Sequence, residues 1–364
     1  MTFARYLSAI LAMRVIIAFC GLAALLQILD LLENANLIFQ AGDGVIGVAT
    51  YALWRLPLIA KQVLPLAVLA GALVTFMTLA RNNELIMMRA AGVTAYRIFA
   101  SMLPVTAIIA GFHFILVDSI APAAENGFAT WWESVERRAG ETKSEPKAPT
   151  FMRAGDGTII SVGATGQDPA SMANVAFFIL DDKGLLLRQL EARVARREND
   201  GWRLYDVHDA QVHDAQVSDQ GLFVSDLAEM PWPERISATS VLAALQPAES
   251  VSTKRLLELL GGEVPATEPA SHYRTELLHN LALPLTAPLM VLLAMPATYG
   301  SSRHGGAARG FLLSFALGLG YLVSDKLFIA MGQAGLLPAL LAAWGATVMF
   351  ASIGIAVLLK FEEP

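Results

Sequence analysis

Charge is scarce in this sequence. Charged residues make up 16% of the 364 positions, whereas 55% are hydrophobic and the mean hydropathy is +0.52. This composition excludes an ordinary soluble enzyme, in which about 25% of residues are charged. The single cysteine, Cys20, excludes an internal disulfide. The sequence lacks both a Lys/Arg-rich domain and a Walker-type phosphate loop, which argues against nucleic-acid binding and against ATP hydrolysis by that route.

The charges that are present lie mostly in the middle of the chain. Of the 58 formal charges, 37 fall between Pro122 and Ala270, where the net charge is −9, while the flanks together carry +3. The sequence therefore predicts a water-exposed domain at about 122–270 between two membrane segments, residues 1–121 and 271–364.

Six stretches of the flanks are long and apolar enough to cross a bilayer, which takes roughly 20 residues per helix. They lie near 11–32, 57–80, 98–121, 274–298, 308–330 and 337–359. Because backbone polar groups in lipid must be paired within the segment, these stretches are predicted to be helices.

The distribution of Lys and Arg in the short loops sets the orientation, because these residues are retained on the cytoplasmic side. They gather at one side of the six predicted helices, at Arg5, Arg14, Arg81, Arg89, Arg97, Arg303, Arg309 and Lys360. Both termini are therefore expected in the cytoplasm. The acidic middle domain is expected on the opposite face, which in a bacterial inner membrane is the periplasm.

The middle domain has a β pattern. From Thr150 onward, residues alternate between apolar and polar, with turns expected at Gly184 and Gly201, where a positive φ is tolerated. Several such strands predict an antiparallel sandwich, an open barrel or a jelly roll. The fold class expected from the residues is an α-helical membrane protein with six transmembrane helices and an inserted periplasmic antiparallel β domain.

Two further patterns in the sequence resemble other kinds of site. His208 and His213, with Asp209 and Asp214, invite a metal site, but residues five apart on a strand point to opposite faces, so surface positions are favoured and no metal is expected. Gly42-Asp43-Gly44 faintly resembles an intramembrane aspartyl protease signature, but it lies in a loop and lacks the first glycine of that pattern.

Polar residues inside the predicted spans are candidates for a lumen, because burying them in lipid is costly. They are Gln27, Asp30, His113, Asp118, His279, Asp325 and Lys326. The alternative is that some of them anchor at the outer interface, and for Asp30 and Asp325 the two interpretations are about equally favoured. Asp325 and Lys326 are adjacent and about 100° apart on a helix, so they cannot both face one cavity.

A short cytoplasmic helix is predicted at about 82–92. Asn82 or Asn83 can cap it and Gly92 can end it. The residues from Leu85 to Met88 make it apolar on more than one side, which favours a docking element for a partner over a loop packed on the protein's own helices.

This segment resembles the coupling helix of the lipopolysaccharide export permeases LptF and LptG, in the run Asn83-Glu84-Leu85 through Met88-Arg89-Ala90-Ala91-Gly92. The order of three helices, a periplasmic β domain and three more helices is similar to that family. The meander from Ala192 to Val207, with Gly201-Trp202-Arg203-Leu204, resembles that family's periplasmic jelly roll, so the resemblance implies a jelly-roll-like β domain. The sequence resembles the G member more than the F member at Tyr273 to Leu277, Pro284, Pro288, Gly335 to Pro338 and Ala342-Ala343-Trp344.

The resemblance implies one half of an ABC-type exporter that extracts lipopolysaccharide from the outer leaflet without an ATPase site or a cofactor of its own. The implied partners are a homologous LptF-like chain, a cytoplasmic LptB-like ATPase dimer and a periplasmic LptC/LptA-like bridge of similar β fold. Glu84 and Arg89 would contact the ATPase, with Leu85 and Met88 filling its groove and Gly92 ending the helix. The implied lumen residues are Gln27, Asp30, Glu33, Asn34, Arg55, Tyr321, Asp325 and Lys326.

One departure from the family concerns lipid A phosphates, which lysines of the first helix often meet in the G member. The matching positions here are Gln27, Glu33 and Asn34. Either Lys326, Arg55 or the partner chain supplies the positive charge, or the headgroup carries fewer phosphates.

Two functions from other classes remain open at this point. A membrane-anchored periplasmic scaffold or sensor would not need an apolar docking helix. An intramembrane hydrolase would use Asp30, Asp118 or Asp325 and would act without an ATPase.

Overall fold

The computed structural model describes residues 3–140, 149–165, 171–181, 184–198, 201–212, 222–233, 237–245, 250–298 and 306–360. The chain divides into two compact units. The helical unit comprises Met1–Glu141, Ala248–Thr253 and Arg274–Pro364, and the strand-bearing unit comprises Thr142–Pro247 and Lys254–Tyr273.

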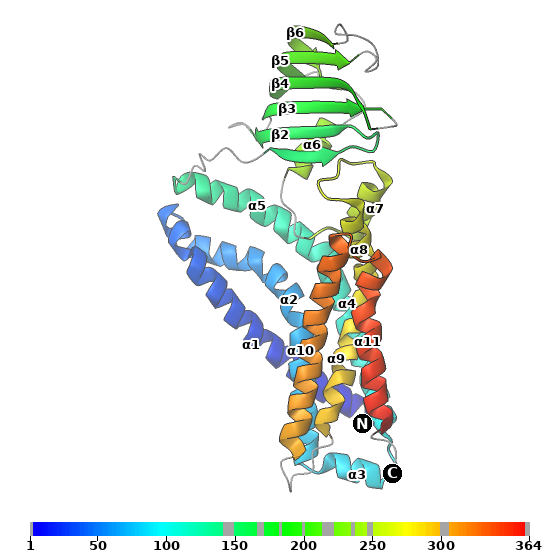
Figure 1. The fold of residues 1–364 in the computed structure, drawn as a ribbon. Helices are drawn as coiled ribbons and strands as arrows, with labels where there is room; N and C mark the ends of the chain where they lie inside the picture. The colour runs from blue at the N-terminus through cyan, green and yellow to red at the C-terminus, as the bar shows by residue number, and fades with distance from the viewer. Residues whose placement is uncertain are drawn as a thin grey trace. The chain divides into compact units, whose positions relative to one another are not determined.

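The helical unit contains six helices long and apolar enough to cross a membrane, which confirms the predicted number within the described residues. Four of them are single helices: α1 (Phe3–Gln40), α2 (Gly44–Arg81), α10 (Gly306–Gln333) and α11 (Ala339–Lys360). The third is α4 (Ala95–Ile115), which continues through the π-turn η1 (Leu116–Ile120) into α5 (Ala121–Arg138). The fourth is α8 (Ala270–Ala282), which continues through η2 (Leu283–Leu285), α9 (Thr286–Ala294) and η3 (Met295–Thr298). The short helix α3 (Glu84–Ala90) follows α2 (Figure 1).

Helices α1 and α2 are longer than the predicted spans. Each has 38 residues, which at 1.5 Å per residue gives about 57 Å, against a hydrocarbon core of about 30 Å. The N-terminal half of α1 packs into the main core, where Gly71 of α2 allows close approach: a Cβ there would lie 2.8 Å from the Val15 backbone. In Figure 1 the C-terminal half of α1 and the N-terminal half of α2 lean away from α9, α10 and α11.

Helix α5 belongs with the helical unit rather than with the strands. The predicted middle domain begins at about residue 122 because the charges concentrate from there, and α5 carries the first of them. In the structure its aromatic face packs against Tyr51 of α2, through Phe128 and Trp132 with ring centroids 5.5 and 5.4 Å away.

The strand-bearing unit is one antiparallel sheet in chain order. Its strands are β1 (Thr150–Arg153), β2 (Ile159–Thr165), β3 (Ser171–Leu180), β4 (Leu186–Glu198), β5 (Gly201–Val212) and β6 (Leu222–Pro231). This confirms the predicted helical membrane protein with an inserted antiparallel β domain. The sheet is an open meander, and Gly184 and Gly201 have the positive φ expected of them, at 80° and 129°.

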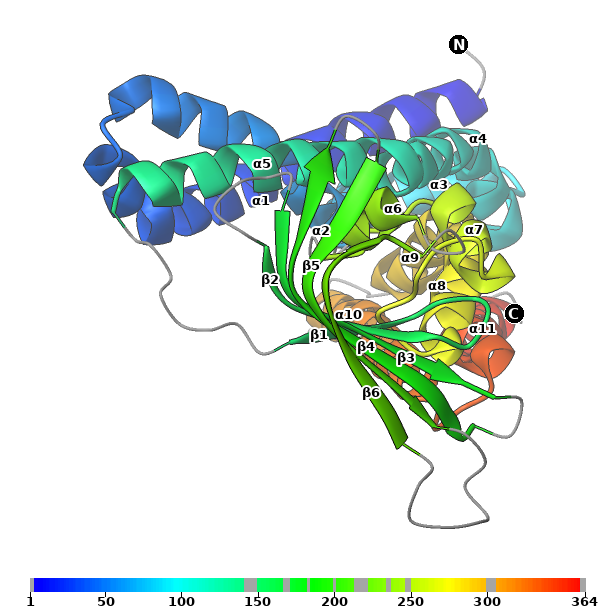
Figure 2. The ribbon, with the colours of Figure 1, turned by 90° about the horizontal axis from the view of Figure 1, so that it is seen from above.

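A transverse crease crosses the sheet. The regular pairing of β3, β4 and β5 skips one row at Asn174, Arg193 and Asp206, and Asn174 and Asp206 have left-handed backbones with φ of 51° and 52°. On each strand the alternation of buried and exposed residues shifts by one position at this row, so that Leu204 and Val207, three residues apart, are both buried. Both halves of each strand therefore direct apolar side chains to the same concave side, and the bend is visible in Figure 2.

The concave side of the sheet is filled by apolar groups. Met172, Phe177 and Leu190 are buried there with Val241 of α6 (Ala238–Ala244). Trp232 packs its ring edge-on to Phe177 with centroids 5.0 Å apart. The strand-bearing unit also includes α7 (Thr253–Gly261) apart from its first residue.

Candidate functional site: the docking helix and the intramembrane polar residues

Helix α3 is held at both ends by specific contacts. Asn83 precedes it with φ 59° and makes no side-chain cap, which differs from the expected capping role. Instead Asn82 donates to Oε1 of Glu84 at 3.2 Å, and the Tyr6 hydroxyl of α1 donates to Oε2 at 3.1 Å. The carboxylate of Glu84 is therefore tied to α1.

Gly92 ends α3 through a Schellman motif. Its φ is 80°, its N–H bonds the Arg89 carbonyl at 2.9 Å, and the next N–H, of Val93, bonds the Met88 carbonyl at 2.9 Å. The Met88 and Val93 side chains pack against the main core. The predicted end of the helix is thus confirmed, with its backbone carbonyls satisfied.

The two apolar sides of α3 have different roles. Leu85 is only 4% exposed and belongs to the main core, against which Met88 also packs. Both residues, to which the family resemblance gives a place in a partner's groove, pack within their own unit. The apolar residues that face outward are Ile86 and Met87, which are 64% and 61% exposed, beside exposed Arg89.

The first predicted lumen residues form a bonded cluster between α1 and α2. Arg55 contacts both carboxylate oxygens of Asp30, at 2.5 Å through Nη2 and 2.9 Å through Nε, and the Tyr51 hydroxyl donates to Oδ2 at 2.8 Å. The Arg55 guanidinium also lies 5.5 Å from the ring centroid of Phe128. The charges of Asp30 and Arg55 therefore compensate each other.

The remaining first-helix candidates differ in environment. Asn34 donates to the Asp30 carbonyl at 2.8 Å, and Glu33 is exposed. The side-chain amide of Gln27 is buried and forms no hydrogen bond within the described part of the chain. Of these candidates, Gln27 is therefore the buried polar group whose partner the structure does not supply.

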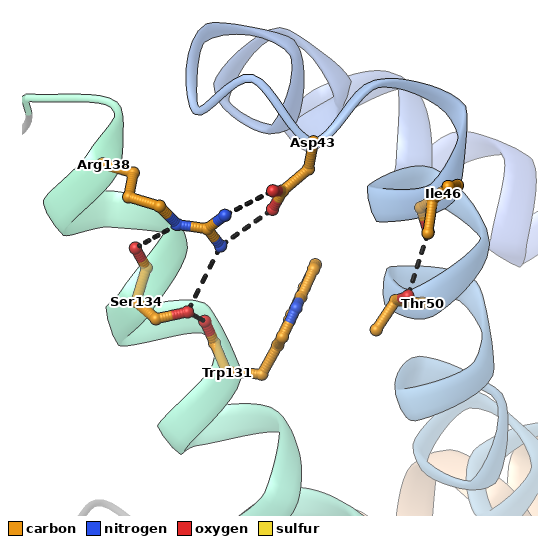
Figure 3. A network of polar contacts seen from close by, with 6 residues as sticks. All are labelled: Asp43, Ile46, Thr50, Trp131, Ser134 and Arg138. Atoms are coloured by element: carbon orange, nitrogen blue, oxygen red, sulfur yellow. Dashed lines mark hydrogen bonds and ion pairs between the residues drawn. The ribbon is translucent and has the colours of Figure 1, made fainter.

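A second charged contact joins α5 to the loop before α2. Arg138 forms a bidentate pair with Asp43, one contact being 2.9 Å, and its Nε donates to the Ser134 carbonyl at 3.1 Å (Figure 3). Sequence reasoning assigned no such role to Arg138 or to the tryptophans of α5. The available signals were Trp131-Trp132 in an amphipathic segment and a lone aspartate between two glycines.

The fifth-span candidates point in different directions. Tyr321 is 1% exposed, and its hydroxyl lies 3.3 Å from Oγ1 of Thr347 in α11. Asp325 is 7% exposed, and its Oδ1 lies 3.9 Å from Nδ1 of His279 in α8. Tyr321 and Asp325 are thus internal to the helix bundle, and the neighbouring Lys326 is exposed.

The polar residues of the sheet are engaged with one another. Asp209 is buried and accepts two bonds from Arg188, at 2.9 and 2.7 Å, and this guanidinium holds the pKa of the carboxyl below its usual value of 3.8. His208 contacts Asp226 at 2.5 Å. His213 and Asp214 lie outside the described residues, and among the residues that are described no group of three or more His, Cys, Asp or Glu could hold a metal.

Comparison with known proteins adds to this geometry. The family model described as "Lipopolysaccharide export system permease LptF/LptG" matches residues 5–360. The chain is 19% identical over 311 residues to lipopolysaccharide export system permease protein LptG of Escherichia coli (strain K12), covering 85% of this chain and 83% of that protein. It is 20% identical over 313 residues to the LptG protein of Haemophilus influenzae, covering 83% and 84%.

Proposed function

The chain belongs to the lipopolysaccharide export permease family LptF/LptG, and on that premise we propose that it is the LptG-like half of an ABC-type exporter. It takes the glycolipid from the outer leaflet of the inner membrane and passes it to a periplasmic bridge of similar β fold. A homologous LptF-like chain completes the lumen, and a separate cytoplasmic ATPase dimer supplies the energy.

The observation that carries this proposal is the construction of α3. The helix is anchored on one side by Leu85 and by the bond from Tyr6 to Glu84, while Ile86 and Met87 face outward. A well-anchored helix that leaves adjacent apolar residues uncovered is suited to receive force from a partner. The partner that fits is a soluble ATPase with an apolar groove and a charged rim that meets Arg89.

The charge distribution supports a cytoplasmic position for α3. Arg81 ends α2 directly before α3, and Arg97 lies in the first turn of α4 directly after it. Arg5, Arg14, Arg309 and Lys360 lie on α1, α10 and α11, toward ends that the proposed topology places on the same side, and Arg303 lies outside the described residues. The proposed topology places both termini with α3 in the cytoplasm and the sheet in the periplasm.

The ion pair of Arg55 with Asp30 affects which residue of this chain can contact the headgroup of the glycolipid. Because Arg55 is bidentate with Asp30, its charge is already compensated, whereas Lys326 is exposed on α10. Lys326 lies seven residues before the end of α10 at Gln333, about 10 Å along the axis. We assign Lys326 as the group of this chain that meets an anionic headgroup near the outer leaflet.

The docking role is tested by making the outward face of α3 polar. We expect Ile86→Glu with Met87→Glu to reduce retention of the ATPase at least tenfold, because buried interface anchors are worth about 2 kcal/mol or more each. The matched control is Val45→Glu with Ile46→Glu, an adjacent pair at the start of α2 that is 79% exposed at both positions. Equal retention in both double variants would contradict docking through α3.

Coupling is tested separately from assembly. Glu84→Ala combined with Arg89→Ala is expected to leave ATP hydrolysis in the reconstituted complex while reducing glycolipid release. Full release by this double variant would count against a coupling role for the charged residues.

Native mass spectrometry of the gently extracted complex tests the whole assignment. We expect one similar six-helix chain, two copies of an ATPase and a bound glycolipid mass. Recovery of the chain alone or as a homodimer, with no ATPase, would favour the membrane-anchored scaffold instead.

A further inference from the structure

Two polar side chains face each other inside the helix bundle without a hydrogen bond. Asp325 of α10 and His279 of α8 have side chains that are 10% and 14% exposed, and their Oδ1 and Nδ1 atoms are 3.9 Å apart. Neither atom has a hydrogen-bond partner among the residues that the structure describes. A hydrogen bond between such atoms needs a separation of about 2.7–3.2 Å.

The contact made by the second ring nitrogen of His279 determines which of the two nitrogens carries the hydrogen. The His279 ring bonds the backbone carbonyl of Ala343 in α11, and a carbonyl can only accept. Because Nδ1 is the ring nitrogen without a partner, Nε2 carries the hydrogen that is donated to Ala343. In a neutral ring Nδ1 is then an acceptor, and it is aimed at a carboxylate oxygen that is also an acceptor.

The other titratable groups around the pair are His113 of α4, Tyr321 of α10 and Lys326 of α10. The ring of His113 is engaged with the Lys61 carbonyl at 3.2 Å, and the Tyr321 hydroxyl lies 3.3 Å from Thr347. Lys326 is exposed. None of these described groups donates a hydrogen bond into the space between Asp325 and His279.

We propose that Asp325 and His279 form an intramembrane site for one proton. The proton resides on the Asp325 carboxyl, which donates it to Nδ1 of His279 after a small side-chain rotation that closes the 3.9 Å separation. Two facing acceptors in an apolar bundle are costly, and one added hydrogen atom converts that arrangement into a bond between α8 and α10. No other reactant is needed, since the proton is taken from the medium.

The site has a consequence for the neighbouring lysine, and this part rests on the proposed function. A neutral Asp325 leaves the positive charge of Lys326 uncompensated by its own helix, so the lysine presents a full charge to an anionic headgroup. An ionised Asp325, one residue away, would reduce that charge. The proton site therefore sets how strongly this chain holds an anionic glycolipid.

Thermal unfolding of the full chain in phosphatidylcholine nanodiscs tests the proton site without any glycolipid. We expect the wild-type Tm to fall as the pH rises between about 5 and 9, because loss of the proton restores two facing acceptors. Asp325→Asn supplies a permanent N–H donor, so its Tm should stay near the wild-type acidic value and should not follow pH. Asp325→Ala should melt about 5 °C lower at acidic pH, since the bond is lost.

The direction of the pH effect separates this site from its neighbours. Protonation of a buried neutral histidine such as His113 destabilises the fold on acidification, which is the opposite sign. Glu33→Gln makes the same carboxyl-to-amide change at an exposed position and should keep the wild-type slope. A pH slope that survives in Asp325→Asn, or a flat wild-type curve, would overturn the proposal.

Lipid retention tests the consequence for Lys326. With purified lipopolysaccharide as the probe, the wild-type complex should retain less at pH 9 than at pH 6, and Asp325→Asn should retain equal amounts. If no glycolipid is retained at any pH, the proposed function fails while the unfolding data still judge the proton site. If lipopolysaccharide retention is independent of pH while the wild-type Tm depends on pH, only the link to Lys326 is refuted and the proton site stands.

Discussion

Asp30 and Asp325 are both carboxylates within membrane-spanning helices, and their surroundings differ. Asp30 receives two bonds from Arg55 and one from Tyr51, whereas Asp325 has an imidazole nitrogen 3.9 Å away and no bond to it. The first carboxylate is compensated and fixes α1 to α2. The second lacks a donor within the described residues, so it is the one suited to bind a proton. The number of donors aimed at an acidic group, rather than its depth in a helix, decides which role it takes.

The sheet offers a third carboxylate for the same comparison. Asp209 is buried and is compensated by Arg188 in the manner of Asp30, but it lies in the domain proposed to face water. Comparing Asp30 with Asp209 shows what the membrane changes for a paired carboxylate, and comparing Asp30 with Asp325 shows what pairing changes within the membrane.

Removing the arginine of the Asp30 cluster should have the largest effect. Arg55→Ala leaves a half-buried carboxylate with only the Tyr51 hydroxyl, and we expect a loss of about 2–3 kcal/mol in the free energy of unfolding. Denaturant unfolding in detergent would measure it. Arg55→Lys should lose less, and the double change with Asp30→Asn should lose less than the two single changes together. Additive losses would show that the pair is not coupled.

The ion pair of the sheet should give an intermediate and pH-dependent effect. Arg188→Ala is expected to cost about 1–2 kcal/mol at neutral pH, seen as faster hydrogen exchange in β4 and β5 of the intact chain. Because Arg188 lowers the pKa of Asp209, the stabilisation is present above pH 3.8 and is lost as the pH falls through the lowered value. The difference between wild type and variant should therefore vanish in strong acid, and a constant difference would contradict the assignment.

The smallest effect should come from the third bond to Asp30. Tyr51→Phe removes only the hydroxyl, and its ring remains packed against Phe128 and Trp132. We expect a loss of about 1 kcal/mol by denaturant unfolding. Thr50→Val, one residue earlier, removes only a local bond to the Ile46 carbonyl and serves as the control. Wild-type stability in Tyr51→Phe would show that Tyr51 contributes through packing alone.

The features that a repeating pattern determines were predictable from the sequence. The six spans follow from apolar length, the turns at Gly184 and Gly201 from residues that tolerate positive φ, and the end of α3 from Gly92. In each case local chemistry restricts the backbone, so distant contacts were not needed.

The direction of side chains in the apolar helices was not predictable. A helix that is apolar all around gives no stripe to orient it, so Leu85 was expected to face a partner and Tyr321 a lumen, while packing turns both inward. The contact of Arg138 with Asp43 joins residues 95 positions apart and has no local signal. Such pairs depend on tertiary packing, which one sequence does not specify by inspection.

The crease across the sheet has a mechanical consequence. Because Asn174, Arg193 and Asp206 interrupt the pairing in one row, the sheet resists deformation unequally in different directions. It is stiff along each strand and compliant about the interrupted row, where the exposed side chains of Arg193 and Asp206 form an ion pair of 3.2 Å. Bending of the sheet is thereby concentrated at this one row, and the strand pairing on either side of the row stays intact.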